Sequence, residues 1–224
     1  MLQMQIAGIN RELGFADPEI TAFHIDFISK GLWPERHAWN KVAYNNGLPQ
    51  EGCPWLCSDV YAWLNSKKMD VPNATTVNPA TVVVDYTTTG VFDKLPSSLQ
   101  NAIVERYDFA PMRYSNDGLL TDDIWRGWQS IGKLWLPNEV EVYGYHAFSS
   151  KTGYDDGVGS QFPIFTDSKT RIKKINGTRY TWLLRDVQAG DASSACCVHM
   201  TGFPNSSGAN GTLGTSPICF RISG

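Results

Sequence analysis

The chain is poor in charge, and no part of it forms a basic stripe. Only 18% of its 224 residues are charged, and 19 basic against 22 acidic residues give a formal net charge of -3 at pH 7. A nucleic-acid-binding domain needs a positive face that neutralises the phosphate backbone. We therefore expect no nucleic-acid partner.

Long apolar runs are also missing. No segment approaches the roughly 20 apolar residues of a membrane-spanning helix. Residues 1–8 (MLQMQIAG) have neither a cationic start nor a long apolar stretch. We expect no membrane insertion and no secretion by a signal peptide, so four glycosylation sequons are interpreted as turns: Asn73, Asn176, Asn205 and Asn210.

The five cysteines are an odd number and show no disulfide framework. Cys53 and Cys57 are four residues apart, but Pro54 lies between them and no second pair follows at zinc spacing. Cys196 and Cys197 are adjacent in a predicted strand, where their side chains point to opposite faces. The sequence therefore predicts free thiols, no bound metal and no cofactor.

Catalytic motifs are absent as well. There is no Gly-x-Ser-x-Gly elbow and no phosphate-binding loop. Glu139 and Glu141 lie two positions apart, which points them to different faces of a helix, and helix capping accounts for both. The histidines are scattered without metal-ligand spacing, so we expect structural or surface roles for them and no catalysis: His24, His37, His146 and His199.

Aromatic and turn-forming residues are abundant. Trp, Tyr and Phe total 27, and Gly and Pro total 32, which is typical of a compact, loop-rich fold. The length suits one large domain or two small ones, and no linker stands out. We treat residues 1–22 as an N-terminal lead-in segment and residues 23–224 as a single domain.

Local patterns predict the elements of the first half. Residues 22–29 and 81–86 are rich in β-branched and aromatic residues and predict strands, whereas residues 33–52 predict a loop. Ser58 is a predicted N-cap for a short helix with one apolar face. Residues 96–98 (PSS) open a second helix.

Residues 135–144 (WLPNEVEVYG) allow two interpretations. The alternation of residues 139–142 is typical of a strand, while Asn138 followed by Glu141 matches a capping box and Gly144 can close the last turn. We predict a short helix that packs on the sheet containing Trp182.

The C-terminal part has strong turn signals. Asn176-Gly177 predicts a hairpin leading into residues 180–185, and residues 195–200 and 217–222 predict two further strands of one small antiparallel sheet. Between them lies a tail of small, polar, turn-forming residues. The predicted class is α+β, with short helices packed on small antiparallel sheets and long loops.

These motifs together carry a resemblance. The resemblance rests on the order of five segments: residues 135–144, Gln161-Phe-Pro-Ile-Phe165, Arg171-Ile-Lys173, Trp182-Leu-Leu-Arg185 and Gly214-Thr-Ser-Pro217. The chain resembles an uncharacterised domain family of phages and prophages of gut Firmicutes, which is common at the C-terminal end of tail fibres and other virion surface proteins. The helix motif and closing strand are also similar to the C-type-lectin fold in its formylglycine-generating-enzyme variant. Tropism-determinant phage proteins diversified by retroelements share that fold.

The resemblance implies a noncatalytic domain, displayed on a virion, that binds a bacterial surface receptor, either a glycan or a protein. It further implies a homotrimer or attachment to other virion proteins. Ser216 stands where family members carry an arginine, and neither Cys196 and Cys197 nor Cys219 has the spacing of the copper-binding pair in the enzymes. A structural virion or collar protein and a formylglycine-type oxidase remain as alternatives.

The tail from residue 191 to residue 216 is the predicted recognition surface. Ser, Asn and Gly give adaptable hydrogen bonding, and Phe203 is the expected aromatic anchor. Three alternatives are a floppy hairpin loop, calcium-binding turns at residues 116–123 and 155–157, and a sugar-stacking site lined by tryptophans. The tryptophans are Trp33, Trp39, Trp55, Trp125 and Trp128. The predicted ligand-binding residues are Asp191, Ser193, His199, Thr201, Phe203, Asn205, Ser206, Asn210, Thr212 and Thr215.

Overall fold

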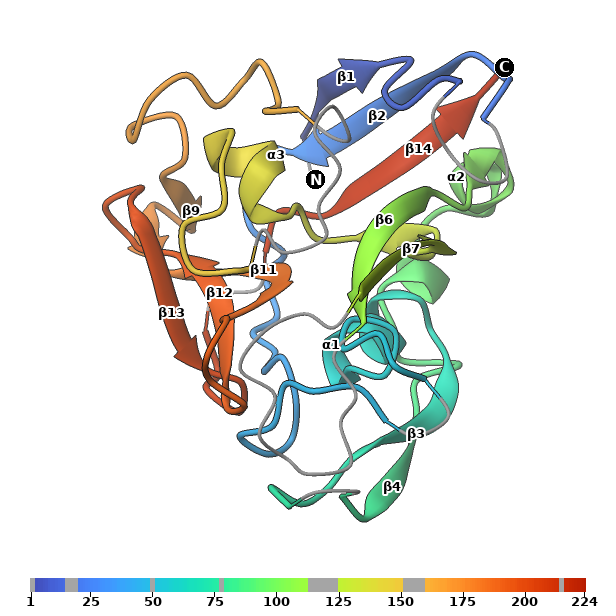
Figure 1. Ribbon diagram of the computed structural model, residues 1–224. Coiled ribbons are helices and arrows are strands. Elements are labelled where there is room, and N and C mark those ends of the chain that lie inside the picture. Colours follow the sequence, from blue (N-terminus) through green and yellow to red (C-terminus); the bar gives the residue numbers. More distant parts are fainter. Residues whose placement is uncertain are drawn as a thin grey trace.

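The computed structural model describes residues 3–14, 20–48, 51–76, 79–112, 125–150, 160–213 and 216–224. Short helices surround several small antiparallel sheets, which confirms the α+β class (Figure 1). Within these ranges no helix has the length and apolar character needed to cross a membrane. The predicted calcium-binding turns and Thr215 lie outside the described residues.

The main sheet joins the two ends of the chain. Its order is β1 (Met4–Ile9), β2 (His24–Ser29), β14 (Cys219–Ser223) and β5 (Ile103–Val104), and β8 (Leu134–Trp135) also pairs with β14. All of these pairs are antiparallel. The strand predicted at residues 22–29 is confirmed as β2. The lead-in segment contributes β1, which pairs with β2 along its length.

A three-stranded sheet has the order β11 (Trp182–Val187), β12 (Ser194–Val198) and β13 (Pro204–Gly208). It differs from the predicted C-terminal sheet in two ways. The strand at residues 217–222 does not join it, because β14 pairs with β2 instead. Residues 204–208, expected to be loop, form β13 because they hydrogen-bond along the buried strand β12.

Three hairpins complete the strands: β3 (Lys68–Pro72) with β4 (Thr81–Asp85), β6 (Tyr107–Met112) with β7 (Trp125–Ser130), and β9 (Lys173–Ile175) with β10 (Thr178–Tyr180). The turn between β9 and β10 has φ of 48° at Asn176 and 84° at Gly177. Positive φ at both central residues matches the predicted two-residue turn.

The predicted helices are present as α1 (Asp59–Leu64), α2 (Ser97–Ala102) and α3 (Glu139–Tyr143), and a 3₁₀ turn, η1, spans Phe92–Lys94. Asn138 accepts a hydrogen bond from the Glu141 N–H at 2.7 Å, and Glu141 accepts one from the Asn138 N–H at 2.8 Å. This reciprocal pair is the predicted capping box. The Arg185 N–H of β11 donates to the Pro137 carbonyl at 3.1 Å, so α3 begins against the three-stranded sheet as predicted.

Tryptophans anchor the core between the sheets. Trp39, Trp55 and Trp182 are fully buried, and each indole N–H donates to a backbone carbonyl, of Leu184 at 3.2 Å, Ile131 at 3.0 Å and Arg171 at 3.0 Å respectively. Buried tryptophans that satisfy their polar atom in this way stabilise the core. Trp39 and Trp55 are therefore unavailable for stacking on a sugar.

Candidate functional site

A tight turn of residues 199–203, called here the hairpin tip, joins β12 to β13. The His199 N–H donates to the Phe203 carbonyl at 2.9 Å, and the Gly202 N–H donates to the His199 carbonyl at 2.8 Å. Gly202 has φ of +88°, and a Cβ there would collide with the Ser168 carbonyl oxygen. Only glycine fits this position, so the tip packs closely against the Ser168 carbonyl.

The hairpin tip carries apolar side chains into solvent. Phe203 is 59% exposed, and Met200 beside it is also exposed. His199 Nδ1 lies 2.7 Å from the Thr201 hydroxyl, which orders the polar side of the tip. An exposed aromatic on a turn closed by backbone hydrogen bonds is a suitable anchor for a binding partner.

Strand β13 continues this surface. It forms the edge of the three-stranded sheet, and in the described part of the chain it pairs with β12 alone (Figure 1, left). Asn205 and Ser206 are half-buried and lie opposite the buried Cys197 and Cys196. A polar edge strand is thereby fixed to an apolar central strand.

The remaining predicted residues lie at the other end of β12. The Asp191 carboxylate accepts from the Ser193 N–H at 2.7 Å and the Ser193 hydroxyl at 2.6 Å, so both side chains are used in forming a turn. Asn210 and Thr212 are exposed, and the Thr212 carbonyl accepts from the Arg36 guanidinium. The Asn45 side chain donates to the Asp191 carbonyl at 2.7 Å.

The predicted recognition residues therefore do not form one loop. Strand β12 separates His199, Thr201 and Phe203 from the group around Asp191, by roughly 17 Å for five residues at about 3.4 Å each. The expectation of a single loop between two strands is wrong, because β13 divides the tail. Of the predicted set, only the residues at and next to the hairpin tip make a continuous surface.

Sequence reasoning missed a polar group around Asp59, the first residue of α1. His37 Nε2 lies 2.9 Å from Asp59 Oδ2, and the Tyr86 hydroxyl donates to Asp59 Oδ1 at 3.0 Å. The His37 ring stacks on Trp63 with centroids 4.6 Å apart. Burial, together with the Asp59 charge, raises the pKa of Tyr86, which keeps its hydroxyl a donor.

The His37–Asp59 pair resembles part of a catalytic triad but lacks its nucleophile. Within the described ranges the side-chain hydrogen bond of His37 leads to Asp59, and no serine, threonine or cysteine side chain bonds to the ring. A short bridge between His37 and Leu213 also ties residues 33–48 to the tail. The His37–Asp59 pair therefore holds the loop of residues 33–48 against α1.

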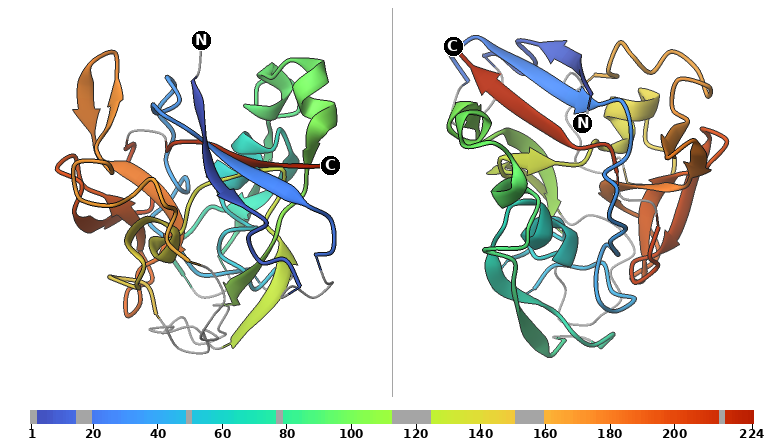
Figure 2. Two further views of the ribbon diagram at one scale, coloured as in Figure 1. Left: turned by 90° about the horizontal axis from the view of Figure 1, so that it is seen from above. Right: turned by 180° about the vertical axis from the view of Figure 1, so that it is seen from behind.

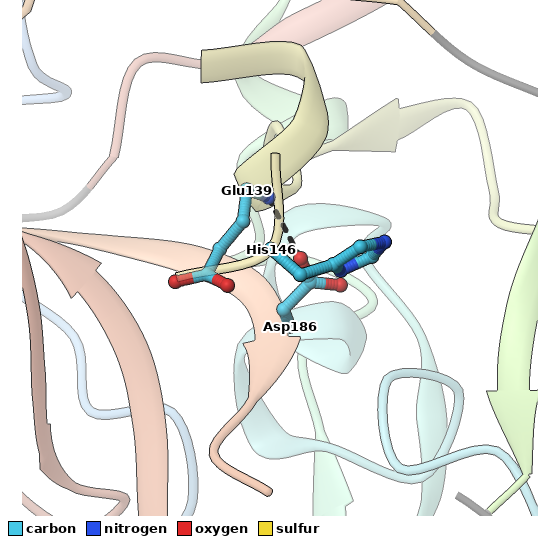
Figure 3. A group of neighbouring side chains, drawn as sticks. All are labelled: Glu139, His146 and Asp186. Carbon is cyan, nitrogen blue, oxygen red and sulfur yellow. Dashed lines mark hydrogen bonds between the residues drawn. The ribbon is translucent and has the colours of Figure 1, made fainter. Parts of the chain in front are cut away.

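Glu139, His146 and Asp186 come together from α3, the following loop and β11 (Figure 3). Their potential ligand atoms lie within 4.8 Å of one another. The spacing argument missed this group because the three residues belong to different elements. Carboxylate oxygens and an imidazole nitrogen are chemically able to hold a divalent cation.

Hydrogen bonds give Glu139 another role. Its Oε2 accepts from the N–H groups of Ala147 at 2.8 Å, Phe148 at 3.0 Å and Ser149 at 2.9 Å, and from the Ser149 hydroxyl at 2.7 Å. Burial and then the nearby Asp186 charge raise the pKa of Glu139. Helix capping was the wrong explanation for Glu139, because its carboxylate accepts hydrogen bonds from the loop after α3. For Glu141, helix capping is confirmed.

A buried ionic network lies under the main sheet. Arg106 contacts Glu141 at 2.5 Å and Glu12 at 2.6 Å, and Arg185 contacts Glu141 at 2.7 Å and also pairs with Asp108. The acidic group of Glu12, Asp108 and Glu141 is thus neutralised by guanidinium groups. The network connects the lead-in segment, β6, α3 and β11.

The five cysteines are all free and buried, as predicted. Burial raises the pKa of Cys53 and of Cys197 to about 12. A thiol of such high pKa is almost entirely protonated at neutral pH and is a poor nucleophile or metal ligand. Ser216 is buried, and its hydroxyl donates to the Leu183 carbonyl.

Comparison with known proteins gives a single match. A family described as a domain of unknown function, DUF6273, matches residues 35–221. No curated protein and no solved structure matches the chain. The match covers most of the sequence, from the loop that carries His37 to the closing strand β14, and the chain therefore belongs to the DUF6273 family.

Proposed function

We propose that this protein is a noncatalytic binding domain that recognises a bacterial surface receptor, a glycan or a protein, through the hairpin tip and β13. The observation that carries the proposal is the 59% exposure of Phe203 on a turn closed by two backbone hydrogen bonds and packed against Ser168. Burying a large apolar side chain stabilises a contact by roughly 1.5–3 kcal/mol. Because backbone hydrogen bonds already close the turn, we expect little of that gain to be lost in ordering it.

The surroundings of Phe203 suit a mixed contact. Thr201 is exposed, and Asn205 and Ser206 are half-buried, so hydroxyl and amide groups flank the aromatic ring. Aromatic residues supply area and small polar residues supply adaptable hydrogen bonds in antibody loops. At the hairpin tip, Phe203 can supply contact area and the neighbouring hydroxyl and amide groups can supply hydrogen bonds to a sugar or a peptide.

Three observations support a noncatalytic role. The His37–Asp59 pair has no hydroxyl or thiol nucleophile within the described residues. All five thiols are buried and protonated at neutral pH. Glu139, which lies in a group with His146 and Asp186, is held by four donors of its own loop.

The C-type-lectin-like fold and display on a phage virion, as part of a tail fibre or another surface protein diversified by a retroelement, are further parts of this proposal. The motifs that carried the resemblance are present as the capped helix α3 and the closing strand β14, which supports them. Diversification of the tail would place variable side chains at the hairpin tip, on a scaffold fixed by β12.

Binding to gut Firmicute cells and to a glycan array tests the proposal. We expect Phe203→Ala to lower binding at least tenfold while melting like the parent, because it removes only exposed area. Val83→Ala is the matched control, since Val83 is 57% exposed on β4, far from the tip in sequence and in a separate hairpin. Equal binding by parent and Phe203→Ala would overturn the assignment of this surface. Particle incorporation without host adsorption would favour the structural virion alternative, and copper-dependent thiol oxidation would favour the oxidase.

A further inference from the structure

Near the start of β2 and the end of β14 the main sheet buries polar residues and partly exposes apolar ones, while Ile28 and Cys219 farther along are buried on the inner side. His24, Asp26 and Arg221 point into the protein and are buried, whereas Ile25 and Ile222 are partly exposed on the opposite side. Antiparallel sheets with one solvated face normally place apolar residues inward and polar residues outward. The outward side of this sheet is called here the outer face. Its residues are apolar, as is usual for a surface that another element or protein covers.

Strand register arranges the outer face in apolar rows. One row is Ile6, Phe27 and Phe220, and the next is Ile9, Ile25 and Ile222. The rings of Phe27 and Phe220 stack with centroids 5.4 Å apart. No charged residue occupies either row.

The described part of the chain leaves the end of this face around Ile9 and Phe23 open, whereas Phe220 is buried. Ile9 is 62% exposed, and Phe23, directly before β2, is 70% exposed. In Figure 1 the strands β1 and β2 lie at the top with no helix or sheet above them, and the view from above in Figure 2 shows the same strands uppermost.

The outer face has a projection at one end and a hollow at the other. The Gly224 N–H donates to the Phe23 carbonyl at 3.1 Å, which places the projecting Phe23 at the end of β14. An apolar cavity of about 290 Å³ lies near the start of β14, lined among others by Met4, Trp33, Leu99 and Phe220. Gly224 follows Phe220 by four positions, which spans roughly 13 Å at about 3.3 Å per residue.

The cavity is large enough for an aromatic ring. An apolar protein cavity of about 150 Å³ binds benzene. A projection and a matching hollow on one face are self-complementary when a twofold axis passes between them, because each projection of one copy then meets the hollow of the other.

We propose that the outer face is the interface of a homodimer in which Phe23 of each copy fills the cavity beside Leu99 of the other. The twofold axis lies in the interface, parallel to the main sheet and perpendicular to the line from Phe23 to the cavity, and passes midway between them. The two outer faces then pack as aligned sheets, as in a β-sandwich.

The size of the outer face agrees with a dimer. Ile6, Ile9 and Phe23 with their half-exposed neighbours present roughly 500 Å² per copy, taking about 150–250 Å² for a whole aromatic side chain and slightly less for isoleucine. Two copies would bury about 1,000 Å² in total, the lower limit for a specific interface. A face without charge also has no like-charge repulsion against its own copy.

Sedimentation equilibrium of the full chain tests the proposal. We expect the parent to be a dimer at micromolar concentration and Phe23→Asp to weaken association at least a hundredfold while keeping the far-UV circular dichroism spectrum of the parent. Val83→Asp is the matched control and should dimerise like the parent, because Val83 is exposed on β4, outside the outer face. A parent that stays monomeric at 100-fold higher concentration, or a Phe23→Asp variant that dimerises normally, overturns the homodimer and leaves the face to another protein.

Cysteine cross-linking tests the twofold arrangement itself. The native thiols are buried, so introduced ones react selectively. A disulfide needs Cα atoms within about 7 Å, and the mass of the oxidised product distinguishes a link between two copies from a link within one copy. We expect Phe23→Cys/Leu99→Cys to form a covalent dimer under mild oxidation, and each single variant to form little. Equal cross-linking by the single variants, or none by the double variant, contradicts this geometry.

Discussion

Arg221 and Asp26 form a two-point ion pair on the inner side of the main sheet. Arg221 Nε lies 2.7 Å from Asp26 Oδ1, and Nη2 lies 2.9 Å from Oδ2. The two residues face each other in the register of β14 and β2, and both are almost fully buried. The last strand of the chain is therefore attached to β2 by charge as well as by backbone hydrogen bonds.

Removing one partner of this pair should destabilise the fold strongly. Asp26→Asn leaves the Arg221 guanidinium buried without its counter-charge, and we expect a loss of about 3–5 kcal/mol in the free energy of unfolding, measured with urea. The double variant Asp26→Leu/Arg221→Met should recover most of that loss. Asp85→Asn is the control, since the Lys68–Asp85 pair is exposed and its loss should change stability little. A small effect of Asp26→Asn would contradict this role.

Stability should fall in acid because of the same network. Burial opposes ionisation of Asp26, but the Arg221 guanidinium outweighs it and holds the folded pKa below the usual value; for Glu12 burial is likewise outweighed by Arg106. The folded chain thus binds fewer protons than the unfolded chain near pH 4, and this stabilisation is present above the unfolded carboxyl pKa and lost as pH falls through the folded pKa. Urea unfolding from pH 6 to pH 2 measures it. Asp26→Leu/Arg221→Met should show a shallower decline, and an identical profile would argue against the pair.

The capping box should contribute measurably to stability. We expect Asn138→Ala to lower the free energy of unfolding by about 1 kcal/mol, because the Glu141 N–H loses its side-chain acceptor. Asn138→Ser keeps an acceptor and should lose much less. Thermal and urea unfolding of the two variants give the comparison, and equal stability of both would show that the cap is unimportant.

The shape of the hairpin tip should depend on Gly202. We expect Gly202→Ala to cost more than about 1 kcal/mol, since alanine is strained at φ of +88° and its Cβ meets the Ser168 carbonyl oxygen. Gly177→Ala tests the separate effect of φ, because Gly177 has φ of +84° and open space around it. If Gly202→Ala costs no more than Gly177→Ala, close packing against Ser168 does not hold the tip.

The thiols should be unreactive in the folded protein. Five free cysteines are buried, and burial raises the pKa of Cys53 and Cys197 to about 12. We expect slow alkylation of the native protein, five equivalents of thiol after unfolding, and no stoichiometric copper or zinc by mass spectrometry. One equivalent of bound metal would contradict this expectation and direct attention to Glu139, His146 and Asp186.

Much of the local structure was predictable from short stretches of sequence. Ser58 caps α1 through the Tyr61 N–H, Asn138 and Glu141 cap α3, and Asn176-Gly177 turns the hairpin of β9 and β10. Each of these depends on groups at most three residues apart. Such contacts form whenever the right residue types occur at the right spacing.

The residues that form the candidate site could be identified only from contacts between parts of the chain that are far apart in the sequence. The tail contained no signal for β13, because Pro204–Gly208 has low strand propensity and is held by hydrogen bonding to buried β12. Similarly, the residue type and position of Glu139 are those of an ordinary helix-capping residue, so the sequence did not distinguish its role. Only the fold brings loop residues 147–149 to its carboxylate.

Sequence by itself determined the caps, the turns, the free thiols and the α+β class, since these depend on composition and on neighbours within a turn. Tertiary structure decided which strands share a sheet, where Phe203 is presented and which side of the main sheet is apolar. The pairing of Asp26 with Arg221 joins residues 195 positions apart. Period-two alternation along a strand cannot say which face is inside until such a partner is placed, and that is why the burial of polar residues in the main sheet became visible only in the folded chain.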